Sequence, residues 1–155
     1  MRLMPKRPKP QLIKFASRMM YVTRREYFNA AHKVYNPKWD DAKNLEVFGG
    51  CANPNWHGHN YELFVTVKGK MNEDTGFVID LKQLSKLIRE NIIDKVDHKN
   101  FNLDVPFMKD VLPSTENIAS AFWEILAKPI NDMGCKLHCV KLKETENNYV
   151  EYFGE

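Results

Sequence analysis

The sequence has no run of 18 apolar residues, and it has only three cysteines among its 155 residues. A membrane-spanning helix needs about 20 mainly apolar residues, so the first absence argues against a membrane partner. The first 20 residues have no apolar core followed by a small-residue cleavage site, which is unlike a secretory signal. Because an odd number of cysteines also argues against a disulfide framework, we expect a cytoplasmic protein.

Acidic residues are absent from positions 1–20, which hold six of the 23 basic residues. The remaining 135 residues hold 17 basic and 20 acidic groups, a formal charge of −3. A mildly acidic body without a basic and aromatic platform argues against nucleic acid as a partner. We expect residues 1–20 to be a disordered basic extension, unless Met19 or Met20 is the true start, and residues 21–155 to form one domain.

Hydrophobic periodicity predicts two strands, two helices and two further strands, with the strands at residues 21–32, 57–70, 136–146 and 149–153. Asp80 is an N-cap candidate for a first helix that runs to about Val96, and Pro113 and Ser114 open a second helix. Residues 33–56 are rich in glycine, proline and asparagine and are predicted to be a long, functional loop. The predicted fold class is α+β, with a four-stranded antiparallel sheet and two helices on one face. Its open sheet edges favour edge-to-edge assembly of several copies.

Three histidines form a candidate metal site. His57 and His59 are two positions apart on a predicted strand, so their side chains share one face at roughly 6–7 Å along the chain. His32 ends another predicted strand. Three neutral imidazoles with an open fourth position are the ligand set of a catalytic zinc ion. We therefore expect His32, His57 and His59 to bind Zn²⁺.

Cys51 lies shortly before His57 and has two alternative roles. As a fourth ligand it would close the site into a structural zinc centre. As a thiolate, with its pKa lowered by a nearby cation and a histidine partner, it would act as a base. The pair Asp97–His98 is a candidate partner, because a carboxylate orients an imidazole that polarises the thiol. The simpler alternative is that His98 caps exposed carbonyls at the end of the first helix.

Glu144 and the start of the second helix are candidate binding groups. Glu144 lies late in the third predicted strand, where it is either an exposed carboxylate or an acceptor for two N–H groups of a guanidine-like heterocycle. Ser114, Thr115 and Glu116 are first of all helix-cap residues. The N-terminal end of that helix can also meet a polar ligand.

Over residues 21–155 the chain resembles the family of 6-pyruvoyl-tetrahydropterin synthase and its relative 6-carboxytetrahydropterin synthase. Trp56 is a departure, since the family commonly has glycine at this position. The matching motifs occur in the family's order and are together highly specific, although they do not fix the reaction branch: Phe28–His32, Asn44–Gly49, Cys51–Asn55, His57–Tyr61, Thr75–Gly76, Asp97–Asn100, Asp104–Pro106, Ser114–Asn117 and Glu144–Asn148.

This resemblance implies the tunnelling fold (T-fold), in which three subunits close a β-barrel and two trimers stack into a homohexamer with active sites between subunits. Arg24 and Arg25 match a basic pair of the family, and they either contact a triphosphate or lie on exposed surface. The resemblance also assigns roles to residues of this sequence: zinc binding to His32, His57 and His59, proton transfer to Cys51, Asp97 and His98, and pterin anchoring to Glu144 with Thr115 and Glu116 nearby.

The implied activity is that of a zinc-dependent carbon–oxygen lyase that converts 7,8-dihydroneopterin triphosphate to 6-pyruvoyl-tetrahydropterin and eliminates triphosphate. The five residues between Cys51 and His57 favour this branch. The alternative is the 6-carboxytetrahydropterin synthase of queuosine biosynthesis, which acts on the same substrate and also releases acetaldehyde. A third interpretation is a non-catalytic zinc- or pterin-binding module, which predicts that Cys51 is a zinc ligand.

Overall fold

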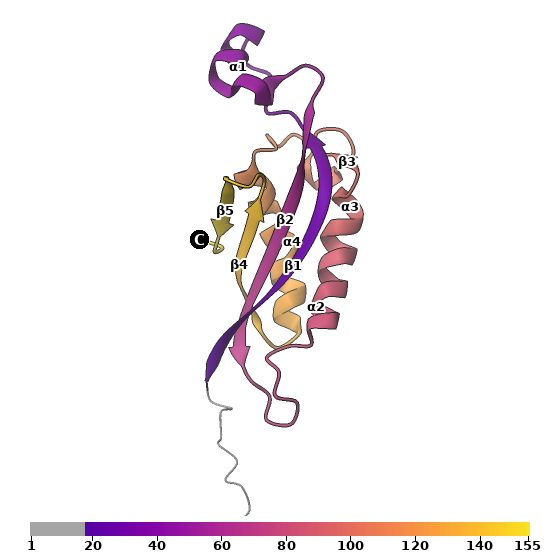
Figure 1. Cartoon of the computed structure of the whole chain (residues 1–155), viewed down its shortest axis with the longest axis vertical. Coiled ribbons are helices and arrows are strands. Elements are labelled where there is room, and N and C mark those ends of the chain that lie inside the picture. Colours follow the sequence, from indigo (N-terminus) through magenta and orange to yellow (C-terminus); the bar gives the residue numbers. More distant parts are fainter. Residues whose placement is uncertain (1–17) are drawn as a thin grey trace, which may run out of the picture.

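The computed structural model describes residues 18–155, so most of the predicted N-terminal extension lies outside the described residues. The described chain forms a sheet with the strand order β3-β1-β2-β4-β5 (Figure 1). Four of its strands match the four predicted ones, and the first begins two residues earlier than expected. The strands are β1 (Met19–His32), β2 (His57–Lys70), β3 (Lys99–Asn100), β4 (Lys136–Lys143) and β5 (Tyr149–Tyr152).

The sheet is mixed, so the prediction of four purely antiparallel strands is wrong. Strands β1, β2, β4 and β5 pair antiparallel, but β3 pairs with β1 in parallel, with Ala30 opposite Lys99 and Ala31 opposite Asn100. A two-residue strand is too short to show a periodicity, so only its pairing with β1 reveals it. The third predicted strand is also shorter, because β4 ends at Lys143.

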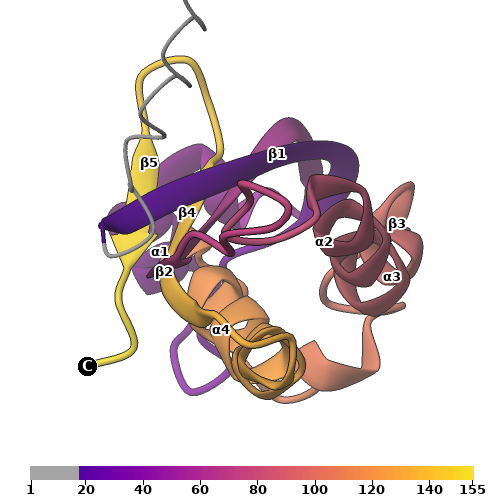
Figure 2. The same cartoon turned by 90° about the horizontal axis from the view of Figure 1, so that it is seen from below.

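Two helical units cover one face of the sheet, as predicted (Figure 1 and Figure 2). The first unit begins at the N-cap Asp80, whose carboxylate accepts a hydrogen bond from the N–H of Lys82 at 2.8 Å. The second begins at the N-cap Ser114. The first comprises α2 (Leu81–Ile88), the π-helical segment η2 (Arg89–Ile93) and α3 (Asp94–Val96); the second is α4 (Thr115–Asp132), and the 3₁₀ turn η3 (Pro106–Met108) lies between them.

The segment between β1 and β2 contains a helix, and the prediction of a continuous loop there is wrong. This helix, α1 (Asp41–Phe48), continues into the 3₁₀ turn η1 (Gly49–Ala52) and projects beyond the end of the sheet (Figure 1). Asn44 is its only buried residue, and its side-chain amide hydrogen-bonds the backbone of Asn36 and Asp40. Because α1 buries no apolar stripe, the sequence lacks the periodic signal of a core-facing helix.

The core lies between the sheet and the two helical units. Inward-facing positions alternate along the central strands, where Phe28, Tyr61 and Leu63 are buried against Leu84 and Phe122 of the helices. Burial of one such side chain stabilises the fold by about 1.5–3 kcal/mol. The same alternation continues to the strand ends, so the rows that build the core also direct His32 and His57 inward. Between residues 18 and 155, no helix is both long and apolar enough to cross a membrane.

Candidate active site

The register between β1 and β2 brings the three predicted ligands together. His32, the last residue of β1, is directly opposite His57, the first residue of β2, and His59 follows on the same face. The ring centroids are 4.4 Å apart for His32 and His57, 4.9 Å for His57 and His59, and 5.1 Å for His32 and His59. One nitrogen from each ring lies within 4.8 Å of the others, which is a group that can hold a metal ion.

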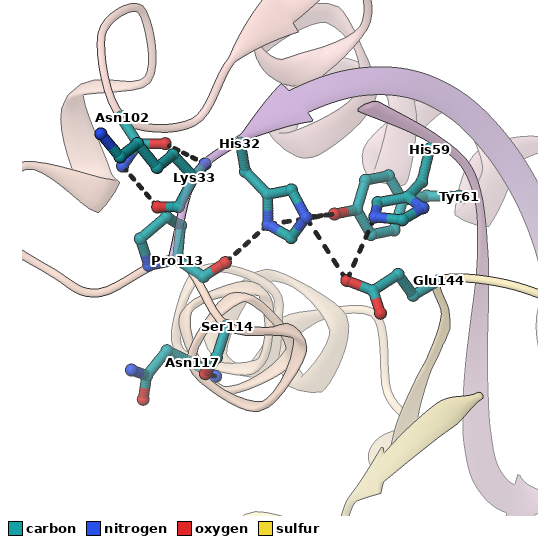
Figure 3. A network of polar contacts seen from close by, with 9 residues as sticks. All are labelled: His32, Lys33, His59, Tyr61, Asn102, Pro113, Ser114, Asn117 and Glu144. Carbon is teal, nitrogen blue, oxygen red and sulfur yellow. Dashed lines mark hydrogen bonds and ion pairs between the residues drawn. The ribbon is translucent and has the colours of Figure 1, made fainter. Parts of the chain in front are cut away.

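Hydrogen bonding orients His32 and leaves nitrogens of His57 and His59 without a partner. The Nδ1–H of His32 donates to the carbonyl oxygen of Pro113 at 2.8 Å, and this bond assigns the proton to Nδ1 and leaves Nε2 as an acceptor (Figure 3). Both ring nitrogens of His57 and Nε2 of His59 are buried without a hydrogen-bond partner. Buried polar atoms normally have partners. A metal ion would take one nitrogen from each ring and so satisfy one nitrogen of His57 together with one of His59, so the residues present fit a zinc site.

The electrostatics also suit a metal. Burial lowers the pKa of His32, His57 and His59, and for each of them a neighbouring imidazole lowers it further. For each of them the carboxylate of Glu144 acts in the opposite direction and does not outweigh these effects. The imidazoles are therefore neutral at pH 7, which is the form that coordinates a metal.

A pocket of about 300 Å³ beside the histidines collects the predicted substrate-binding residues. Glu144 lies in the β4–β5 turn and not in strand β4, which ends at Lys143. In this turn the N–H of Glu144 donates a hydrogen bond to the carbonyl of Asn148 at 3.0 Å. Its Oε1 lies 3.5 Å from Nε2 of His32 and 3.7 Å from Nε2 of His59 (Figure 3). The N-terminal end of α4 contributes Thr115 and Glu116, so the helix-cap residues also line the pocket.

Cys51 lines the same pocket and is held by backbone pairing. It lies in η1, and its carbonyl accepts a hydrogen bond from the N–H of Val34 at 2.9 Å. Within residues 18–155, the group with metal-ligand spacing consists of the three histidines without Cys51. Burial raises the pKa of the Cys51 thiol, and the charge of Glu144 raises it further. The lowering of the thiol pKa expected for a base depends on a nearby cation and a histidine partner, which act against these two effects.

Asp97 and His98 lie together but apart from Cys51. His98 Nδ1 is 3.1 Å from Asp97 Oδ2, and the other carboxylate oxygen accepts a hydrogen bond from the N–H of Asn29 at 2.9 Å. The imidazole is therefore oriented by Asp97 instead of capping a helix. His98 lines a second cavity of about 510 Å³, which His59 also lines. In the described part of the chain, no hydrogen bond, ion pair or ring contact joins Cys51 to Asp97 or His98.

Four further residues have contacts or conformations that the sequence did not show. The guanidinium groups of Arg24 and Arg25 are paired with carboxylates, at 2.8 Å from Glu26 and 2.7 Å from Glu62 respectively. Trp56 has a positive φ of 65°, the conformation in which glycine is favoured, and its ring lies 5.8 Å from Nζ of Lys33. The Pro113 carbonyl that orients His32 was missed, because a backbone acceptor has no signature in the sequence.

The family model of 6-pyruvoyl tetrahydropterin synthase matches residues 21–155. The chain belongs to this family. Human 6-pyruvoyl tetrahydrobiopterin synthase is 46% identical over 134 residues, which cover 86% of this chain and 91% of the human protein. The structure of Caenorhabditis elegans 6-pyruvoyl tetrahydropterin synthase has a TM-score of 0.84 and 35% identity, over 91% of this chain and 99% of that one. Bacillus subtilis 6-carboxy-5,6,7,8-tetrahydropterin synthase is more distant, with 30% identity over 69% of this chain and 73% of that protein.

Proposed function

We propose that the protein is a zinc-dependent lyase that converts 7,8-dihydroneopterin triphosphate to 6-pyruvoyl-tetrahydropterin with elimination of triphosphate. The observation that carries this proposal is the group of three neutral imidazoles with unpartnered nitrogens beside a pocket that holds Cys51 and Glu144. Family membership supports a pterin-processing enzyme, and the relatives of the pyruvoyl branch are more similar than the carboxy relative.

Each predicted residue has a role that its position supports. His32, His57 and His59 would hold the zinc ion, which when bound supplies Lewis acidity that makes adjacent substrate C–H bonds more acidic. Glu144, at the wall of the pocket, accepts two N–H groups of the pterin ring. Thr115 and Glu116 line the same wall and contact the ring's polar edge.

Proton transfer requires a base, and we assign it to Cys51. The thiol reaches the pocket, where burial and the charge of Glu144 raise its pKa, and the charge of the zinc ion and a histidine partner would favour its thiolate. The oriented imidazole of His98 has the required chemistry, with Asp97 fixing its ring. We propose that a neighbouring copy supplies this pair, in a homohexamer of two stacked trimers whose active sites lie between subunits. The edge of β1 that lies outside its short pairing with β3, and the edge strand β5, would then be covered by barrel closure.

The decisive experiment is to incubate the purified, zinc-loaded protein with 7,8-dihydroneopterin triphosphate and to identify the products by mass. We expect 6-pyruvoyl-tetrahydropterin and triphosphate in equal amounts. A 6-carboxy product together with acetaldehyde would assign the protein to the other branch. Unchanged substrate that stays bound would support a non-catalytic pterin-binding module and contradict the proposal.

A further inference from the structure

We propose that Asn102 is a positioning residue that fixes the distance between the metal-binding His32 and the base Cys51. This inference rests on the roles assigned above to those two residues. Asn102 lies after β3, outside the pocket that holds Cys51 and Glu144, and its side chain contacts neither a ligand nor the thiol. Its effect is transmitted through the backbone of Lys33, the residue that follows His32.

The side chain of Asn102 binds both peptide groups of Lys33. The N–H of Lys33 donates to Oδ1 of Asn102 at 2.8 Å, and Nδ2 of Asn102 donates to the carbonyl of Lys33 at 2.9 Å (Figure 3). A primary amide carries one acceptor and one donor group in the same relation as a peptide, so it can replace a strand as the partner. The backbone pairing of β3 with β1 continues to Phe101, whose N–H donates to the carbonyl of Ala31 at 2.9 Å. Asn102 thus extends this pairing by one residue, past the point where β1 ends.

The other side of the same segment binds the Cys51 loop. The β1–β2 ladder ends at His32, so Lys33 and Val34 lie beyond it. Val34 donates its N–H to the carbonyl of Cys51 at 2.9 Å, and its side chain is buried at the wall of the pocket. Three consecutive residues therefore carry the metal ligand, the contact with Asn102 and the contact with Cys51. A shift of the Lys33 peptide would move the histidine and the cysteine relative to each other.

Asn102 is itself held in a braced turn. Its N–H donates to Oδ1 of Asn100 at 2.9 Å, and the N–H of Asn100 donates to Oδ2 of Asp104 at 2.8 Å. The intervening Phe101 is fully buried, with its ring 5.9 Å from that of Tyr61 and 6.1 Å from that of Phe28. The buried Phe101 thereby anchors the turn in the core. A positioning residue needs this kind of rigid support.

The test compares Asn102→Ala and Asn102→Asp with Leu103→Ala, whose exposed side chain lies in the same turn. Alanine removes both contacts with Lys33, whereas aspartate keeps the acceptor and removes the donor. For each full-length variant, zinc affinity is measured by competition with a chromogenic chelator. The exchange rate of the Val34 amide is measured by NMR on the metal-free protein, and kcat and KM are measured with 7,8-dihydroneopterin triphosphate.

We expect Asn102→Ala to lower zinc affinity and kcat by about 10- to 100-fold, the range found when groups that orient metal ligands are removed, with a smaller change in KM. The Val34 amide should exchange at least about tenfold faster, because the Lys33–Val34 peptide that carries it is no longer held by Asn102. Asn102→Asp should show intermediate values, and Leu103→Ala should match the unmodified protein.

A folded Asn102→Ala variant with unchanged zinc affinity and unchanged Val34 exchange would overturn the inference. If Asn102→Ala does not fold, the test rests on Asn102→Asp alone. Unchanged zinc affinity and unchanged Val34 exchange in Asn102→Asp would then overturn the inference. Failure of the unmodified protein to convert the substrate would refute the proposed function only. Zinc affinity and Val34 exchange would still test the role of Asn102, because neither depends on turnover.

Discussion

The end of the β1–β2 ladder and the connection between α3 and β3 carry the two halves of the proposed chemistry, and they differ in completeness. At the ladder end, three buried or half-buried histidines converge within one chain, and one nitrogen of each lies within 4.8 Å of the others. At the connection, Asp97 and His98 form an oriented pair, but the side chain of His98 is 79% exposed and lies away from Cys51. One chain thus completes the candidate metal site and leaves the proposed proton-transfer set divided.

Backbone pairing accounts for this difference. Adjacent antiparallel strands hold opposite residues within a few ångströms, so the register of His32 with His57 suffices for a metal site. Asp97 and His98 are instead held at the outer edge of β1 by the backbone of Asn29. The N–H of Asn29 donates to the Asp97 carboxylate, and the carbonyl of Asn29 accepts a hydrogen bond from the N–H of His98 at 2.7 Å. An exposed catalytic pair at a sheet edge is well placed to meet a second subunit.

The largest effect is expected from His57→Ala, which removes one of the three proposed zinc ligands. With two imidazoles left, zinc affinity should fall by more than about 100-fold and turnover should be abolished. His138→Ala is the matched control, since His138 lies on β4 against Tyr21 and outside the site. Metal analysis and product formation measure the outcome. Retention of both zinc and activity by His57→Ala would remove this residue from the site.

The second largest effect is expected from substitutions in the proposed proton-transfer set. Cys51→Ala and His98→Ala should each lower kcat by about 10²- to 10⁴-fold, the usual contribution of a general acid or base, while zinc binding is retained. When the two variants are co-expressed, about a quarter of the sites in mixed oligomers should contain both intact residues if the sites form between copies. Activity should then recover to that extent, whereas a set completed within one chain would leave the mixture inactive.

The smallest effect on function is expected from Glu26→Gln. Glu26 lies on β1, away from the three histidines and from the Asp97–His98 pair. Burial raises the pKa of this carboxyl group, but hydrogen bonds from Ser85 and Arg24, the charge of Arg24 and a hydrogen bond from Arg89 outweigh it, so the pKa lies below its ordinary value of 4.5. The stabilisation is therefore present above pH 4.5 and is lost as the pH falls through the folded-state pKa.

Glu26→Gln should accordingly lower the free energy of unfolding by about 1–3 kcal/mol at pH 7. The difference in the free energy of unfolding between this variant and the unmodified protein should become smaller below pH 4. Urea denaturation at pH 7 and at a pH below 4 measures this difference. Zinc affinity and kcat should stay unchanged. A loss of zinc binding in this variant would mean that the body of β1 and its metal-binding end are coupled, contrary to the comparison above.

Much of the fold followed from local patterns. Alternation along residues 57–70 gave a strand with the observed bounds, and the caps Asp80 and Ser114 marked the starts of both helical units. Helix α1 was missed because a buried asparagine, and not an apolar stripe, holds it to the preceding turn. Strand β3 was missed because two residues have no periodicity, although its pairing with β1 precedes the turn that presents Asn102.

The amino-acid sequence by itself determined which residues are candidates for the chemistry, because residue type and a spacing of two on a strand are local properties. It determined that His57 and His59 share a face, and that Cys51 is close to them along the chain. The tertiary structure alone decided that His32 lies opposite His57, that the Pro113 carbonyl sets its free nitrogen, and that Asp97 and His98 are separated from Cys51. Register and loop contacts join residues distant in sequence, and packing of the whole domain selects them.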